Sequence, residues 1–149
     1  MMAQNKANVN VVGISGDIPL QIRATATIAA SAGANSVISA TIYPYNLSSG
    51  VSETLVPLDE FWHVTGFQTD TSYTPNFAIQ ILQTGVVIPS NVYANSVTSS
   101  LTNPYRLQTS MVVSGGKTFA SQIQITAANG TTAVDVTYTI FVVRQKIKG

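Results

Sequence analysis

Residues 134–143 read Val-Asp-Val-Thr-Tyr-Thr-Ile-Phe-Val-Val, and this stretch decides the fold. Up to Ile140, apolar side chains alternate with polar ones, which is the pattern of a β-strand with one buried face. Phe141 and Val143 then interrupt the alternation, so we expect the end of this strand to be covered on both faces. The stretch predicts a protein built on sheets.

The same alternation appears at residues 20–30 and 118–126. No stretch predicts a convincing helix, because the alanines of residues 24–34 alternate at strand period with β-branched threonines, which favour the pleated alternative. Shorter apolar stretches, separated by Gly, Pro, Asn and Ser, lie at residues 9–14, 37–43, 51–56, 61–69, 77–83, 86–93 and 105–113. Eight to ten short strands at this spacing predict an all-β, two-sheet antiparallel sandwich or a barrel.

The connection before the last strand has two interpretations. Asn129-Gly130 is typical of a tight hairpin, which would pair the last two strands in one sheet. Residues 127–132 could equally form a loop that crosses from one sheet to the other. The sequence leaves both open.

The composition indicates a surface that is polar but poor in charge. Charged residues make up 9% of the 149, against about 25% in an average soluble domain. About a third of the chain is instead 15 Ser, 18 Thr, 10 Asn and 9 Gln. Interface cores are depleted in charge, because desolvating an unpaired charge is costly, so this surface favours close contact between copies. The net charge of +1 argues against electrostatic capture of nucleic acid.

Residues that could carry catalysis are few. His63 is the only histidine and there is no cysteine, so a multi-histidine or thiolate metal site is excluded, and we expect no cofactor. Asp59 and Glu60 are neighbours that would project to opposite faces of a strand, which makes them a poor acid/base pair. An enzyme using His63 with one of these acids is the weakest hypothesis, and we expect no catalytic activity.

The end of the chain carries alternating cations. Arg144, Lys146 and Lys148 would project to the same side of an extended strand. They are candidate contacts for phosphate groups or lipid headgroups, and the simpler interpretation is a solvated chain end.

Aromatic residues near predicted strand ends are the remaining candidates for binding. Their rings could insert into a neighbouring subunit or stack on a glycan, and the simpler interpretation is the edge of the core. These candidates are Tyr43, Tyr45, Tyr73, Tyr93 and Tyr105. We expect Trp62 to be buried, on the face opposite His63.

The strand rhythm from Val9 to Arg144, with the turn and strand of Val56 to Phe67 inside it, resembles that of single jelly-roll capsid proteins of icosahedral viruses. The resemblance implies a jelly-roll topology, self-assembly and no enzymatic activity. It divides the chain into a short N-terminal arm at 1–8, one sandwich domain at 9–145 and a basic tail at 146–149. Many coat proteins carry a basic arm, whereas residues 1–10 contain only Lys6, so we do not expect direct condensation of nucleic acid.

The resulting expectation is a virion structural protein, either a capsid subunit or an accessory coat protein in the capsid shell. Its expected partners are copies of itself and other capsid proteins, with an internal membrane as a further partner. The alternative is a carbohydrate-binding or adhesin-type β-sandwich, in which Tyr43, Tyr45, Trp62 or Tyr73 stacks on sugar rings.

Overall fold

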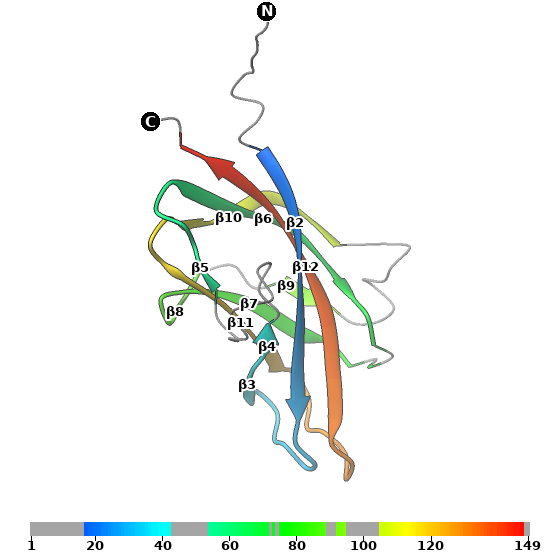
Figure 1. The fold of residues 1–149 in the computed structure, drawn as a ribbon. Coiled ribbons are helices and arrows are strands. Elements are labelled where there is room, and N and C mark those ends of the chain that lie inside the picture. Colours follow the sequence, from blue (N-terminus) through cyan, green and yellow to red (C-terminus); the bar gives the residue numbers. More distant parts are fainter. Residues whose placement is uncertain are drawn as a thin grey trace, which may run out of the picture.

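The computed structural model describes residues 17–42, 54–71, 73, 75–88, 92–94 and 105–147. They form two antiparallel sheets packed face to face, with no helix among them (Figure 1). The predicted all-β sandwich is confirmed. The proposed arm at 1–8 lies outside the described residues, as do Lys148 and Gly149 of the tail.

The first sheet contains the long strands, in the order β10 (Tyr105–Ser114), β6 (Glu60–Thr69), β12 (Val134–Lys146), β2 (Asp17–Ile28) and β4 (Thr41–Ile42). The second sheet has the order β3 (Val37–Ser39), β11 (Thr118–Ile125), β7 (Phe77–Gln83) and β8 (Val86–Val87). Two more short strands pair at its margins, β5 (Thr54–Leu55) with β11 and β9 (Val92–Ala94) with β7.

The pairings are those of one long hairpin rolled into a sandwich. β2 pairs with β12, β3 with β11, β6 with β10, and β7 with β8 and β9, so each pair is nested inside the one before it. Every chain connection between successive nested strands crosses between the sheets, apart from those that join β7, β8 and β9 within the second sheet. This is the jelly-roll order, in agreement with the expected topology.

The last connection takes the second of its two possible forms. β11 lies in the second sheet and β12 in the first, so residues 126–133 cross between the sheets. The Asn129 amide holds this crossing loop, because its Nδ2 donates to the carbonyls of Ala29 at 2.9 Å and Thr132 at 3.1 Å. The backbone N–H of Ser31 donates to Gly130 O. The Asn-Gly pair therefore serves a loop that closes one end of the sandwich.

The core follows from the alternation in the sequence. Every second residue of β2 from Ile22 to Ile28 is buried, and so is every second residue of β11 from Phe119 to Ile125. Trp62 is fully buried, as expected, with its ring 5.6 Å from that of Phe119 between centroids. The largest buried side chains are Trp62, Tyr138, Phe67, Phe77 and Phe119.

One polar contact joins the two sheets through the core. The hydroxyl of Tyr138 in β12 lies 2.6 Å from the hydroxyl of Ser121 in β11. Ser121 Oγ also contacts the backbone carbonyl of Gln80 in β7, at 3.3 Å. Burial raises the pKa of Tyr138 far above its ordinary value, so the phenol is neutral.

Candidate functional site

Arg144, one of the predicted phosphate contacts, is held by an acid within the molecule. Its Nε donates to Glu60 Oε1 at 2.9 Å and its Nη2 to Glu60 Oε2 at 2.7 Å. Trp62 Nε1 donates to the same Oε1 at 2.9 Å. Hydrogen bonding by Arg144 lowers the pKa of Glu60 against the opposing effect of burial, so the pair is ionic at neutral pH.

Lys146 lies two residues further along β12, beside a second acid. Its Nζ is 3.7 Å from Asp59 Oδ2, and both side chains are 57% exposed. The acids at 59 and 60 thus compensate two of the three predicted cations, while Lys148 lies outside the described residues. Contact of this tail with phosphate stays a prediction. Lys146 is the better candidate, because Arg144 is already bound to Glu60 by two hydrogen bonds.

The structure describes the side-chain surroundings of only one of the five predicted tyrosines. Tyr73 is 8% exposed and packs 6.1 Å from the ring of Phe77, and burial raises its pKa. It therefore offers no open ring face. Tyr43 and Tyr45 lie outside the described residues. For Tyr93 in β9 and Tyr105 in β10 only the backbone is described.

Among the described residues, no hydrogen bond or ion pair joins His63 to a carboxylate. Its Nε2 lies 3.0 Å from Oε1 of Gln145 on the neighbouring strand, while the Glu60 carboxylate is held by Arg144 and Trp62. No group of three His, Asp or Glu side chains that could hold a metal ion occurs among the described residues.

Exposed apolar side chains gather at one end of the sandwich, which we call the apolar end. Leu58 stands in the loop before β6 and is 84% exposed, and the nearby Leu55 is 65% exposed. The amide of Ile147 donates to Asp59 O at 2.7 Å, which places Ile147 beside Leu58. The apolar end comprises Ile18, Leu55, Leu58, Val86 and Ile147.

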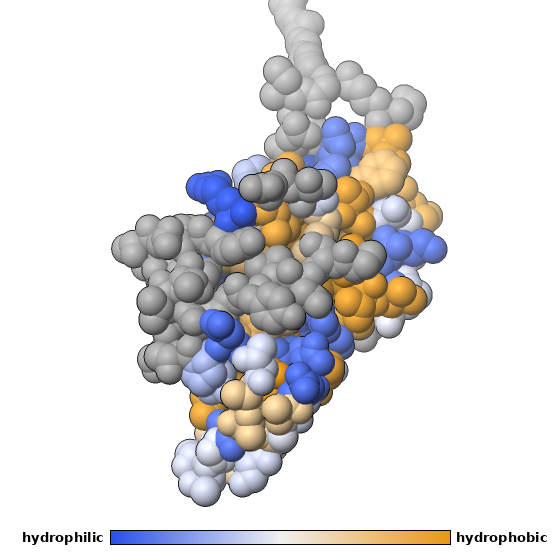
Figure 2. Space-filling view, turned by 180° about the vertical axis from the view of Figure 1, so that it is seen from behind, coloured by the Kyte–Doolittle hydropathy of each residue, from blue (hydrophilic) through white to orange (hydrophobic). Residues whose placement is uncertain are grey.

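The surface view agrees with this placement. The face seen in Figure 2 shows large orange areas toward the upper right, whereas the lower tip is pale or blue. The lower tip in Figure 1 is where residues 126–133 cross between the sheets, far from the start of β2 and the end of β12 at the top. On this face, the apolar surface lies mainly away from that tip.

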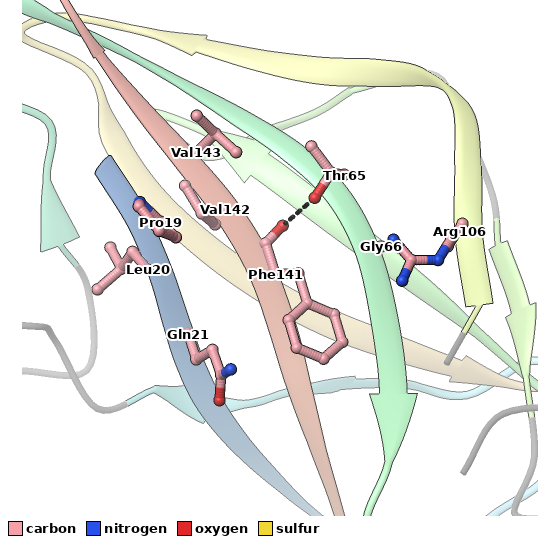
Figure 3. A pocket seen from close by; sticks show the side chains of 9 residues that line it. All are labelled: Pro19, Leu20, Gln21, Thr65, Gly66, Arg106, Phe141, Val142 and Val143. Carbon is pink, nitrogen blue, oxygen red and sulfur yellow. Dashed lines mark hydrogen bonds between the residues drawn. The ribbon is translucent and has the colours of Figure 1, made fainter. Parts of the chain in front are cut away.

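A second feature lies on the outer face of the first sheet, where a shallow hollow of about 330 Å³ opens over β12 and β6. Phe141 and Val143 line it, only half-buried, so the expected cover over both faces of this strand end is incomplete. Gly66 forms its floor, and Arg106 extends from β10 toward Gly66 (Figure 3). We define the hollow by the row Gln21, Phe141, Gly66 and Arg106.

Sequence reasoning missed this hollow, although two signals were present. A glycine inside a strand often marks a bulge or a close approach, and Gly66 has that position. Phe141 is an aromatic residue on the polar side of its strand. The register brings the two together as cross-strand partners, with Thr65 as the extra residue of a bulge whose hydroxyl donates to Phe141 O at 3.4 Å.

Comparisons with known proteins add no identity. A scan against models of protein families finds no match, and a search of curated proteins finds no significant match. In the part of the chain that the structure describes, no helix is long and apolar enough to span a bilayer.

Proposed function

We propose that this protein is a self-assembling structural subunit of a virion shell, either a capsid subunit or an accessory coat protein without catalytic activity. The observation that carries the proposal is the apolar end, which exposes large aliphatic side chains at one end of a β-sandwich whose sequence is rich in neutral polar residues and poor in charge.

The exposure at this end is costly for an isolated molecule. Leu55, Leu58 and Val86 are each at least 65% exposed, and covering one such side chain is worth about 1.5–3 kcal/mol. These residues stand on neighbouring loops and strand ends. Leu55 pairs with Thr118 at the start of β11, and the amide of Thr84, in the turn before Val86, donates to Thr118 O at 2.8 Å. Such a group is an efficient contact for a neighbouring copy.

The surrounding surface supports close packing. Two acids beside the apolar end, Asp59 and Glu60, are already paired with Lys146 and Arg144. A partner approaching here meets no unpaired acid at these two positions, which lowers the desolvation cost of contact there. Under this proposal, the protein acts in the capsid shell with copies of itself and other capsid proteins. An internal membrane stays a further proposed partner, through the cations at the end of β12.

The apolar end can be tested by a double substitution, Leu55→Ser with Leu58→Ser. We expect the wild-type protein to form oligomers and the double variant to shift toward the monomer, measured by size-exclusion chromatography with light scattering. Val37→Ser is the matched control, because Val37 is 53% exposed but lies in β3, away from the apolar end. Its association should equal that of the wild type.

The thermal unfolding midpoint should change little in both variants, because the replaced side chains are exposed. A double variant that associates as strongly as the wild type would contradict the proposal, and so would equal weakening by Val37→Ser.

The tyrosine-based glycan module gains no support from the described residues. Of its candidate rings, the structure describes the surroundings of Tyr73 and Trp62, and both are buried.

A further inference from the structure

Four residues on adjacent strands of the first sheet form one row across its outer face. Phe141 of β12 is the register partner of Gln21 in β2 on one side and of Gly66 in β6 on the other. Gly66 is in turn the partner of Arg106 in β10. Cross-strand partners project to the same face, so the phenyl ring, the amide and the guanidinium share one surface.

Elsewhere on this face, polar side chains contact one another. Thr25 and Thr137 meet at 3.2 Å, and Thr139 donates to Asp70 at 2.7 Å. On the other side of the hollow, His63 and Gln145 meet at 3.0 Å. The row of Phe141 is different, because Gly66 has no side chain with which to bridge its neighbours.

The polar groups of this row are left available. Among the described residues, neither the Gln21 amide nor the Arg106 guanidinium takes part in a side-chain hydrogen bond or an ion pair, and both side chains are exposed. Among the described residues, no ring contact joins Arg106 to Phe141 and no ion pair joins Arg106 to an acid. The hollow therefore presents a phenyl ring, an amide and a cation.

We propose that this hollow binds a carboxylated sugar, meaning a pyranose that carries an acid group. A phenyl ring packs against the apolar C–H face of a sugar ring. A guanidinium forms paired hydrogen bonds with a carboxylate, and an amide donates to and accepts from hydroxyls. The hollow offers these three groups in a line.

The dimensions fit this ligand. Neighbouring strands lie about 4.8 Å apart, so Phe141 and Arg106 are separated by two strand spacings, about 10 Å at the backbone. A single sugar ring with its carboxylate spans the space between two inward-leaning side chains at that separation, above the bare backbone of Gly66. The volume of about 330 Å³ is at the lower end of ligand sites, which suits one ring rather than a long chain.

Saturation-transfer NMR tests the ligand class directly, and it tolerates large assemblies because it observes the sugar. The probes are glucuronic acid and N-acetylneuraminic acid, with glucose and acetate as controls. We expect transfer to ring protons of the acidic sugars and little to either control. Equal transfer to glucose would show that the carboxylate is not recognised. If acetate competes as well as the acidic sugars do, the site binds anions and not sugars.

Variants test whether the hollow is the site. Arg106→Gln should weaken binding of the acidic sugars at least about tenfold, and Arg106→Lys should weaken it less, because the charge stays and the paired geometry is lost. Phe141→Leu keeps an apolar side chain but removes the ring, and it should also weaken binding. Lys117→Gln is the matched control, an exposed cation in the turn between β10 and β11, and it should bind like the wild type.

The outcome that would overturn the proposal is equal weakening by Arg106→Gln and Lys117→Gln, which would indicate unspecific attraction. Unchanged binding in Phe141→Leu would overturn the proposed stacking of the phenyl ring on the sugar. If binding is confirmed, vesicles containing a sialylated glycolipid and a soluble uronic acid oligosaccharide distinguish a cell-surface lipid from a polysaccharide as the source of the sugar.

Discussion

The guanidinium of Arg144 and the carboxylate of Glu60, 84 residues apart in the chain, meet through two hydrogen bonds at the open end of the first sheet. The contact fastens the end of β12 to the start of β6, and Trp62 adds a third bond from inside the core. It therefore stabilises the pairing of β12 with β6 beside the apolar end.

Removing the acid from this contact should destabilise the fold. We expect Glu60→Ala to lower the free energy of unfolding by about 2–4 kcal/mol, because it leaves Arg144 partly buried without its counter-charge and Trp62 Nε1 without its acceptor. Urea unfolding monitored by Trp62 fluorescence measures the change. Asp59→Asn is the matched control, since its partner Lys146 is exposed, and it should cost at most about 1 kcal/mol. Equal losses in the two variants would contradict this account.

The same pair gives stability a specific dependence on pH. The folded state lowers the pKa of Glu60 below its ordinary value of 4.5, so the ionised form binds better in the folded state than in the unfolded one. The resulting stability is fully present above pH 4.5 and is lost as the pH falls through the lower, folded-state pKa. In Glu60→Gln this part of the acid dependence should disappear. Urea midpoints between neutral and acidic pH test it, and a variant that loses stability in parallel with the wild type would refute the assignment.

The hydrogen bond between Tyr138 and Ser121 should contribute less to the free energy of unfolding than the ion pair of Arg144 and Glu60. Tyr138→Phe removes the hydroxyl that meets Ser121 and should lower the free energy of unfolding by about 0.5–2 kcal/mol, because Ser121 keeps its contact with Gln80 O. A double-mutant cycle with Ser121→Ala isolates the coupling. Fully additive losses in that cycle would show that the two hydroxyls do not interact.

Association through the apolar end should resist salt. The contact proposed there is aliphatic, so raising sodium chloride from about 0.1 M to 1 M, which shortens the screening length from about 10 Å to 3 Å, should not dissociate the oligomer. Sulfate should strengthen it, because it favours apolar burial. Light scattering across a salt series makes the comparison. Dissociation in sodium chloride would indicate that ionic contacts hold the copies together.

Local alternation was sufficient to predict the strands and their buried faces. Ile22, Ile123 and Val136 are buried as their period requires, since a strand places alternate side chains on opposite faces whatever its partners are. The choice of sheet for each strand is not local. Asn129-Gly130 suits a hairpin as a dipeptide, but the rolled pairing of β11 with β3 and of β12 with β2 makes it a crossing loop.

The surfaces were harder to predict, because they depend on partners distant in sequence. Arg144 has the spacing of an exposed basic tail, and only the pairing of β12 with β6 reveals that Glu60 already holds it. Gly66 and Phe141 are unremarkable separately, and their register makes them the floor and wall of one hollow. The exposure of Leu58 likewise depends on how the loop before β6 lies against Gly116.

The central claim is that copies of this chain associate through exposed apolar side chains into a regular shell. The most direct measurement is electron microscopy of the purified wild-type protein, with its mass in solution determined by light scattering over a range of concentrations. The account predicts closed particles or uniform capsomers whose mass is a fixed multiple of 15.7 kDa. A protein that stays monomeric at the highest concentration reached, with no regular particle on the grid, would contradict it.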